Sequence, residues 1–325
     1  MENASSVREL AERGHRRIAL ACGVFDGVHR GHQCILDELR SLAVRHRAAP
    51  VALTFNPHPR VILSHCTPPR VLTTPWQKTR LLKQCGAREV VLMRFSHHLA
   101  SLDGETFVRR HLLPAEVSVV GLCVGESWRF GSSGEGDVDF LRDLGEQLGF
   151  EVVAVPELTW YRKPVSSTRI RGAIQNGRLD QARKMLGRAY RVCGHVIHGK
   201  GIGSRRLNCP TANLADPMIL LPPSGVYAAR SLVHSEKEQS APRALDGVVY
   251  IGSAPTFVGD SATAMPPSLE LHLLDFDEDI YGARIEVEFE GLLRPEVTFG
   301  SEQELEHQIQ LDIAEARKRL ANRGA

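Results

Sequence analysis

The chain has 325 residues, of which 42% are hydrophobic and 24% are charged, and its formal net charge is +2. This length exceeds the usual size of one hydrophobic core, so we expect two domains. Basic and acidic residues are interleaved, which argues against a nucleic-acid surface, and no segment approaches the roughly 18 apolar residues that a membrane span needs. The charged start lacks the apolar core of a signal peptide, so we expect a cytoplasmic protein that binds neither nucleic acid nor membrane.

The seven cysteines are odd in number, and none forms a CxxC pair. This pattern argues against a disulfide framework and against a zinc site. We expect reduced and mostly buried thiols.

Between residue 17 and about residue 160, short apolar runs alternate with amphipathic stretches. The runs RIALACGV, VALTF, EVVLMRF and VSVVGLCV have the length and composition of buried strands. Thr74, Pro75 and Gln77 supply a cap residue, a proline in the first turn and an amide three residues after the cap, which predicts a helix start. This half of the chain is therefore expected to form a parallel sheet covered by helices.

After Gly187 the sequence changes to β-rich segments separated by Gly, Pro, Asp and Asn. Such short strands without helical periodicity between them indicate a small antiparallel barrel. The last segment, 301–320, places apolar residues on one helical face, and Ser301 with Glu304 has the spacing of a capping box. A C-terminal helix packed on the barrel is the expected result.

The segment of about residues 178–191 carries this change of composition and is expected to contain a helix. We place the domain boundary there, which gives an α/β domain over 1–185 and a β domain over 186–325.

The segment GVFDGVHRGH, Gly23 to His32, lies between the first predicted strand and the first predicted helix. In an open α/β sheet this is where ligands bind. Its glycines let a phosphate approach the backbone, the helix start offers N–H groups, and His29 and His32 can donate to phosphate oxygens. These features favour nucleotidyl transfer, and the alternative is a glycine turn beside two ordinary histidines.

In a second motif, VSSTRIR, Arg169 can reach phosphates from the first turn of a helix.

Two sites in the second half have weaker patterns. Thr211 and Asn213 place a hydroxyl and an amide carbonyl on the same side of an extended segment, where they can complete the oxygen shell of a nucleotide-bound Mg²⁺. Glu270 begins an alternating run whose leucines point to the core, so its carboxylate lies on the other face and could receive a hydroxyl proton. The alternatives are a turn-forming asparagine and a solvated glutamate.

The segments GVFDGVHRGH, TFNPHPR and VSSTRIR, in this order, resemble the FMN adenylyltransferase module of bacterial riboflavin kinase/FAD synthetases, which is related to the HxGH nucleotidylyltransferases. The segments CPTANL, LPPSGVYAA, GVVYIGSAPTF, LELHLLDFDEDIYG and LLRPEVTF resemble the riboflavin kinase module of the same family. This resemblance implies a Rossmann-like nucleotidylyltransferase domain, then an antiparallel six-stranded β-barrel with a C-terminal helix. It also implies that riboflavin, FMN, FAD and ATP are the small-molecule partners and that Mg²⁺ is required.

In the first module, the resemblance implies catalytic roles for His29 and His32. It implies flavin contacts from Asn56, His58, Ser127 and Trp128, although the family usually has Asp or Asn followed by Phe at the last two positions. The implied ATP-binding residues are Gly23, Phe25, Asp26, Gly31, Ser167, Thr168 and Arg169.

In the second module, the resemblance implies Mg²⁺ binding by Thr211 and Asn213, proton abstraction by Glu270 and a flavin contact from Arg294. The chain departs from the family pattern where Ser204 and Asn208 replace glycines and where Tyr250 replaces an asparagine. The implied ATP-binding residues are Gly199, Lys200, Gly201, Gly203, Arg205, Pro210 and Thr211.

Three other functions are consistent with the sequence: the same architecture with only one active module, a non-catalytic flavin-binding regulator, and adenylyl transfer to a different phosphorylated small molecule. The sequence also leaves the oligomeric state open, including self-association.

Overall fold

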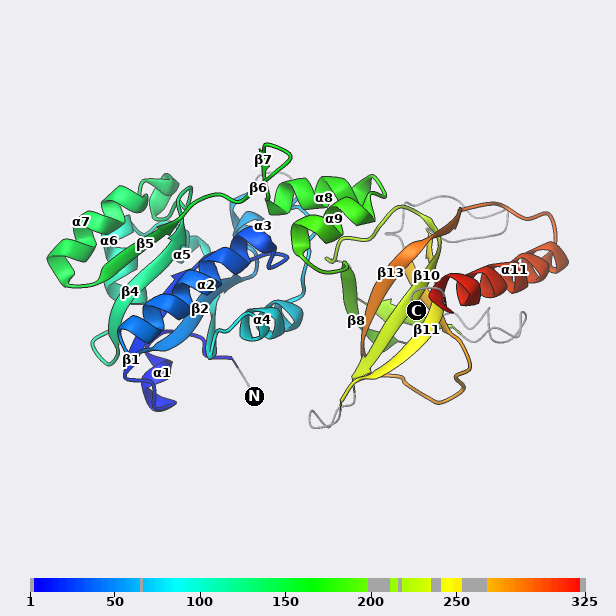
Figure 1. Cartoon of the computed structure of the whole chain (residues 1–325), viewed down its shortest axis with the longest axis horizontal. Coiled ribbons are helices and arrows are strands. Elements are labelled where there is room, and N and C mark those ends of the chain that lie inside the picture. The colour runs from blue at the N-terminus through cyan, green and yellow to red at the C-terminus, as the bar shows by residue number, and fades with distance from the viewer. Residues whose placement is uncertain are drawn as a thin grey trace. The chain divides into compact units, whose positions relative to one another are not determined.

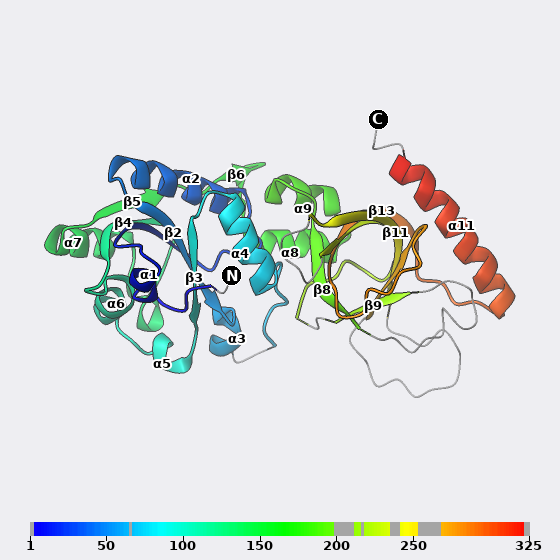
Figure 2. The ribbon, with the colours of Figure 1, turned by 90° about the horizontal axis from the view of Figure 1, so that it is seen from below.

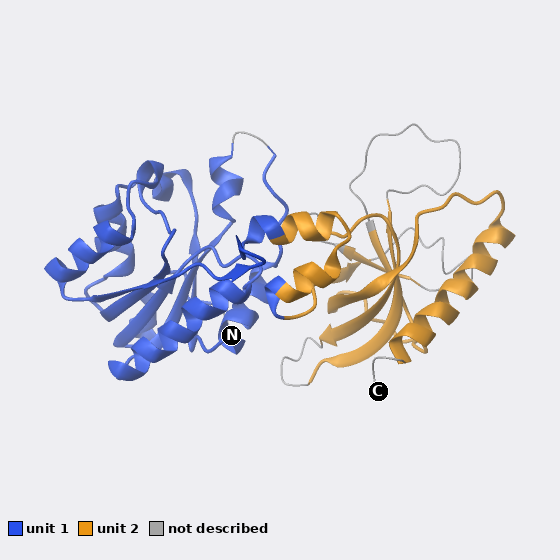
Figure 3. Cartoon of the chain, turned by 45° about the horizontal axis from the view of Figure 1, so that its top comes forward, with its two compact units in different colours: residues 1–169, 185–187 blue, residues 170–184, 188–325 orange. Residues whose placement is uncertain are grey.

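The computed structural model describes residues 3–64, 67–197, 211–215, 218–234, 241–252 and 268–321. The chain divides into two compact units (Figure 3). The first unit comprises residues 1–169 and 185–187, and the second comprises residues 170–184 and 188–325. Among the helices of the described ranges, none combines the length and the apolar character that a bilayer crossing requires.

The first unit contains a five-stranded sheet whose strands are all parallel, as the alternating pattern predicts. Its strand order, β3-β2-β1-β4-β5, places β1 in the centre, with β2 on one side and β4 on the other. The direction of winding therefore reverses beside β1, and ligands bind at such switch points. The strands are β1 (Arg17–Cys22), β2 (Ala49–Asn56), β3 (Glu89–Arg94), β4 (Ser118–Gly125) and β5 (Glu151–Val155).

Helices cover both faces of this sheet and form two apolar layers (Figure 1). Residues of α2 and α4 pack on one face, and residues of α1, α5, α6 and α7 pack on the other. The predicted start of α4 is confirmed, because Thr74 and Gln77 form a reciprocal capping box. The helices are α1 (Glu9–Glu12), α2 (Arg30–Arg45), α3 (Pro59–Leu63), α4 (Pro75–Gln84), α5 (His97–Ala100), α6 (Gly104–Phe107), a π-helical turn (Val108–Leu112), a 3₁₀ turn (Ser132–Gly134) and α7 (Val138–Leu148).

A short hairpin and two helices follow β5. The hairpin consists of β6 (Thr159–Trp160) and β7 (Lys163–Pro164), and the helices are α8 (Ser167–Gln175) and α9 (Leu179–Leu186). The helix expected within residues 178–191 is therefore present as α9.

The second unit contains the predicted six-stranded barrel, which is closed and antiparallel in the order β10-β11-β12-β9-β8-β13 (Figure 2). Val249, Ile251, Leu269 and Leu271 are buried in its interior, so the residues between them point outward. The strands are β8 (Arg191–Ile197), β9 (Ala212–Ala215), β10 (Gly225–His234), β11 (Arg243–Gly252), β12 (Ser268–Leu273) and β13 (Arg284–Pro295).

The C-terminal helix α11 (Glu302–Ala321) lies along the outside of the barrel, as expected (Figure 2). Ala316 and Leu320 pack against Ala228 of β10 in a small buried cluster. Half of the predicted capping box forms: the Glu304 N–H donates to Ser301 Oγ at 3.2 Å. The Glu304 carboxylate accepts from the N–H of Gly300 instead, at 3.0 Å, so the reciprocal contact is offset by one residue.

Candidate active sites

The predicted motifs of the first unit lie at one edge of its sheet. Residues 23–32 directly follow β1, residues 57–58 directly follow β2, and residues 126–128 directly follow β4. Since these strands are parallel, their carboxyl ends meet at the same edge. The fold therefore gathers the segments predicted to bind ATP and flavin beside the switch point.

The backbone between β1 and α2 is tightly folded. Phe25, Gly27 and Val28 have positive φ angles of 49°, 83° and 38°. Positive φ is uncommon for residues with a side chain and is strained for a β-branched valine. The buried side chains of Phe25 and Val28 hold this conformation, and a Cβ at Gly27 would lie 2.8 Å from Leu72 Cδ1. The Gly27 N–H donates to Thr73 Oγ1 at 3.1 Å and the Val28 N–H donates to the Phe25 carbonyl oxygen at 3.1 Å, so internal hydrogen bonds hold this turn.

His29 and His32 form a stacked pair at the start of α2. Their ring centroids are 3.5 Å apart with planes at 18°, and the His32 N–H donates to His29 Nδ1 at 3.3 Å. Because Nδ1 is the acceptor, a neutral His29 ring carries its proton on Nε2, which becomes a donor. A Cβ at Gly31 would lie 3.2 Å from His29 Cε1, so the absence of a side chain there makes room for the ring.

Asp26 is buried, and its carboxylate accepts several hydrogen bonds from the chain itself. The Leu72 N–H donates to it at 3.0 Å, and the N–H and hydroxyl of Thr73 both donate to it at 3.2 Å. The Thr73 hydroxyl oxygen also accepts from the Gly27 N–H at 3.1 Å. Asp26 therefore joins the segment before α4 to the segment between β1 and α2, and a direct contact with ATP stays a prediction.

The VSSTRIR segment lies against the first motif. Ser167 Oγ donates to the carbonyl oxygen of Asp26 at 2.8 Å, while Thr168 is exposed. Arg169 Nη1 donates to the carbonyl oxygens of Trp160 and Lys163 at 2.8 and 2.9 Å, and its guanidinium carbon lies 5.1 Å from the Trp160 ring centroid. The start of α8 thus reaches the motif, with Arg169 bound to the β6-β7 hairpin.

The residues predicted to contact flavin in this unit lie in different environments. Asn56 is exposed at the end of β2, and His58 caps α3 by accepting from the Arg60 N–H at 3.1 Å. Ser127 is exposed after β4. Trp128 stacks on Phe130, with ring centroids 4.6 Å apart and planes at 23°, so one face of the indole packs against the core.

Lys78 of α4 is a buried cation that the sequence reasoning missed. Its ammonium donates to the carbonyl oxygens of Phe55 at 3.0 Å and Val24 at 3.3 Å, behind the ends of β2 and β1. Burial lowers the pKa of Lys78 to about 8, and the charge of Asp26 opposes this shift. The only signal in the sequence is its spacing of four residues from buried Leu82, which places both on one helix face.

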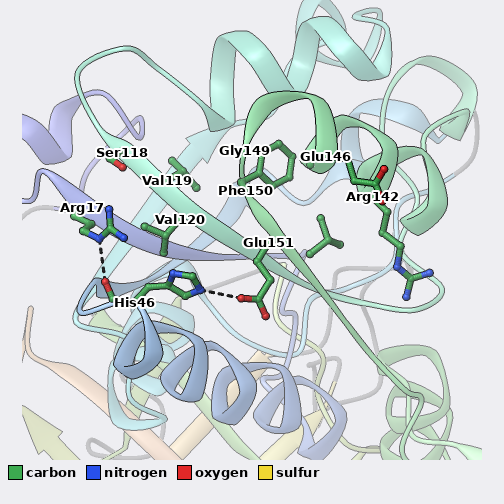
Figure 4. A pocket seen from close by; sticks show the side chains of 12 residues that line it. Arg17, His46, Ser118, Val119, Val120, Arg142, Glu146, Gly149, Phe150 and Glu151 are labelled. Carbon is green, nitrogen blue, oxygen red and sulfur yellow. Dashed lines mark hydrogen bonds and ion pairs between the residues drawn. The ribbon is translucent and has the colours of Figure 1, made fainter.

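A hollow of about 600 Å³ lies away from the motifs, near the amino ends of the strands (Figure 4). Arg17, Ser118 and Glu151, the first residues of β1, β4 and β5, line it together with His46. His46 Nε2 lies 2.8 Å from Glu151 Oε2, and this hydrogen bond and the adjacent Arg45 lower the pKa of Glu151. None of the predicted site residues lines this hollow.

In the second unit, predicted site residues lie in one row across the outer face of the barrel. Asn213 pairs with Glu270, Glu270 with Tyr250, Tyr250 with Val226, and Val226 with Arg294. Directly paired residues of neighbouring strands project from the same face. The candidate metal ligand, the candidate base and the candidate flavin contact therefore share one surface, which we call the kinase row.

Arg294, at the end of the kinase row, is bound to α11. Its Nε and Nη2 donate to Asp312 Oδ2 at 3.0 and 2.9 Å, and Gln308 Nε2 donates to Asp312 Oδ1 at 2.9 Å. Asp312 is buried, and a helix sequence gives little sign that an acidic side chain will face the barrel. The sequence reasoning missed it.

The predicted phosphate loop of the second unit lies outside the described residues. Thr211, just before β9, is described and half-buried. The other calls on this segment, together with the departures at Ser204 and Asn208, stay predictions: they are Gly199, Lys200, Gly201, Gly203, Arg205 and Pro210.

Two family models match the chain. One, described as FAD synthetase, matches residues 11–169, and the other, described as riboflavin kinase, matches residues 186–320. Both matches agree with the resemblance found in the motifs.

Relatives named bifunctional riboflavin kinase/FMN adenylyltransferase are similar over nearly the whole chain. The Escherichia coli K12 protein is 33% identical over 318 residues, which cover 98% of this chain and 97% of the relative. The Pseudomonas fluorescens protein is 37% identical over 303 residues, which cover 93% of each chain. A crystal structure described as a macrolide-efflux protein from Streptococcus pneumoniae has a TM-score of 0.75 at 28% identity and covers 93% of this chain and 94% of its own.

Proposed function

The chain belongs to the family of bifunctional riboflavin kinase/FMN adenylyltransferases, and we propose that the two reactions are divided between its two predicted domains. It is a transferase with both activities, and ATP is the co-substrate of each. We propose that residues 186–325 phosphorylate riboflavin to FMN, and that residues 1–185 adenylylate FMN to FAD. The observation that supports this division most strongly is the placement of one motif set at the sheet edge of the first unit and the other in the kinase row.

In the kinase step, the Glu270 carboxylate accepts the proton of the ribityl 5′-hydroxyl. The freed oxygen forms a bond to the γ-phosphorus of ATP, and the bond from this phosphorus to the bridging oxygen breaks and releases ADP. Arg294 contacts the flavin from the far end of the kinase row. Tyr250 and Val226 lie between these two residues.

The oxygen donors beside Glu270 fit a Mg²⁺ ion. Asn213 pairs directly with Glu270, and Thr211 lies two residues before Asn213. The described residues contain no cluster of three or more His, Cys, Asp or Glu that could hold a metal. Mg²⁺ commonly takes only one or two protein ligands and receives the others from water and nucleotide phosphates. When bound, it would neutralise charge on the phosphoryl group, while Thr211 and Asn213 orient it.

In the adenylyl step, a phosphate oxygen of FMN forms a bond to the α-phosphorus of a second ATP, and pyrophosphate leaves. The attacking phosphate is already anionic, so the reaction requires no strong general base. His29 donates through Nε2 and His32 assists in binding charge that develops on the phosphate oxygens. The triphosphate of ATP is bound by the backbone that follows β1 and by the side chains of Ser167, Thr168 and Arg169. We also propose a cytoplasmic location, since both steps consume ATP.

To test this proposal, the purified protein is incubated with ATP and Mg²⁺, once with riboflavin and once with FMN as the substrate. The amounts of riboflavin, FMN and FAD are then measured by chromatography. Wild type should convert riboflavin through FMN to FAD. Glu270→Ala should lower FMN formation by a factor of about 10³ and leave FMN adenylylation unchanged, since a positioned base contributes roughly 10²–10⁴-fold. His32→Ala should do the reverse, with accumulation of FMN.

The matched controls are Glu306→Ala in α11 and His98→Ala in α5, which alter exposed side chains, and both should behave as wild type. Binding of flavin without consumption of ATP by the wild type would instead support a regulator. If Glu270→Ala and His32→Ala affected the same reaction, the division between the two units would be wrong.

A further inference from the structure

Tyr250 occupies the centre of the kinase row. It pairs with Glu270 of β12 on one side and with Val226 of β10 on the other, and Val226 pairs with Arg294. The side chain is half-buried on the outer face of the barrel. A long aromatic side chain between the candidate base and the candidate flavin contact calls for a physical explanation.

The Tyr250 hydroxyl donates a hydrogen bond to Glu296, which follows the last residue of β13. Gly252, two residues further along β11, faces the same side as Tyr250. A Cβ at Gly252 would lie 2.0 Å from Tyr250 Oη and 2.7 Å from Glu296 Oε1. A side chain at position 252 would clash with this hydrogen bond, so the contact between Tyr250 and Glu296 requires the glycine.

The segment from Glu296 to Ser301 joins β13 to α11, and its last two residues are hydrogen-bonded to Glu304 of α11. Arg294, which lies two residues before this segment and binds Asp312 of α11, has its guanidinium carbon 5.4 Å from the ring centroid of Phe299 within the segment. Tyr250 binds Glu296, the first residue of the segment, and so attaches the segment to β11 beside Glu270.

The environment of the Tyr250 hydroxyl favours its protonated form, which can donate a hydrogen bond. Burial, the hydrogen bond to Glu296 and the negative charges of Glu296 and Glu270 all raise the pKa of Tyr250, and the charge of Arg294 acts in the opposite direction. The hydroxyl therefore stays protonated throughout the neutral range. The influence of both Glu270 and Arg294 on this one hydroxyl agrees with its place between them in the kinase row.

We propose that Tyr250 is a positioning residue of the kinase site, whose bond to Glu296 holds the segment after Arg294 beside Glu270 and so orders the flavin side of the site. This inference rests on the proposed roles of Glu270 and Arg294. It requires no contact between Tyr250 and the reacting atoms, so its loss should weaken riboflavin binding more than turnover.

The experiment measures riboflavin kinase kinetics of the full chain at saturating ATP. Tyr250→Phe keeps the ring and removes the hydroxyl, and it should raise the KM for riboflavin about tenfold with kcat within about twofold. Glu296→Ala should have the same effect, and the double variant should be no worse than either single variant. Glu296→Gln keeps an acceptor oxygen and should stay within about threefold of wild type.

Tyr281→Phe, which alters an exposed tyrosine before β13, is the matched control and should leave KM unchanged. The proposal is overturned if Tyr250→Phe leaves the KM within about twofold of wild type, or if the effects of Tyr250→Phe and Glu296→Ala add fully.

A second measurement does not depend on turnover. Amide hydrogen exchange of residues 296–301 in the full chain should be faster in Tyr250→Phe than in wild type and in Tyr281→Phe. Unchanged exchange would overturn the proposal. If wild type formed no FMN, the proposed function would fail, and the exchange comparison would still decide whether Tyr250 holds this segment.

Discussion

At the scale of single residues, Asp26 shows how one side chain of a predicted ATP-binding motif can stabilise the fold. The resemblance implies that it binds ATP, whereas its carboxylate in the structure binds the Leu72 and Thr73 N–H groups and the Thr73 hydroxyl. Hydrogen bonds to a buried charged acceptor are among the stronger ones in proteins. Asp26 therefore shapes the loop that carries His29 and His32, whether or not it also contacts the nucleotide.

Asp26→Asn separates these two roles. An amide has one acceptor oxygen and adds two donors, so it cannot replace all of these hydrogen bonds. We expect the free energy of unfolding of the first unit to fall by about 3 kcal/mol, with loss of FMN adenylylation and unchanged riboflavin phosphorylation. Urea unfolding and the two separate assays measure this. Lost adenylylation at unchanged stability would show that Asp26 acts on the nucleotide alone.

At the scale of secondary structure, α4 contributes more to the first site than its amphipathic pattern suggests. Its start is fixed by the Thr74 and Gln77 capping box. One turn later, Lys78 places its ammonium under the carboxyl ends of β1 and β2, where it binds the carbonyl oxygens of Val24 and Phe55. The helix thus joins the two strand ends from which the predicted ATP and flavin segments emerge.

Burial of Lys78 predicts a dependence of stability on pH. The pKa of this group falls from its ordinary 10.5 to about 8 in the folded chain. Between these values the unfolded chain binds the proton and the folded chain does not, so the contribution of Lys78 to stability rises with pH. The free energy of unfolding of the wild type, relative to Lys78→Met, should increase by about 3 kcal/mol from pH 8 to pH 10.5.

Urea unfolding of the first unit at several pH values tests this expectation. Lys83→Met, on the same helix with a more exposed side chain, is the matched control for the loss of a lysine, and it should not reproduce the effect of Lys78→Met. A constant difference between Lys78→Met and wild type would contradict the prediction.

At the scale of the whole molecule, each unit has its own sheet and its own apolar core. Leu20 is fully buried in the parallel sheet of the first unit, and Leu271 is fully buried inside the barrel of the second. The candidate site residues of each reaction lie within one unit. A mutation in the apolar core of one unit should therefore impair only the reaction of that unit.

Matched core variants test this independence. Leu20→Ala and Leu271→Ala should each destabilise one unit by about 2–5 kcal/mol, since both leave a cavity in a packed core. Heat inactivation of FMN adenylylation should become faster in Leu20→Ala, and heat inactivation of riboflavin phosphorylation should become faster in Leu271→Ala. If either variant accelerated both inactivations equally, the two units would unfold as one.

The sequence by itself determined the architecture and the family of this protein. The α/β half, a small antiparallel barrel and the C-terminal helix follow from local periodicity and from turn and cap residues such as Thr74, Pro75 and Gln77, because these signals act between near neighbours in the chain. The number of six strands came from the resemblance to the family. Motifs such as GVFDGVHRGH also identify the chemistry locally, since a phosphate site needs glycines and donors within a few residues.

Only the tertiary structure decided which distant side chains meet. The hydrogen bonds of Asp26 to Leu72, of Lys78 to Phe55 and of Tyr250 to Glu296 join residues that are 46, 23 and 46 positions apart. The kinase row depends on the register between five strands, and Asp312 is buried only because α11 lies against the barrel. Strand register and burial are properties of the packed chain, so periodicity within one segment cannot specify them.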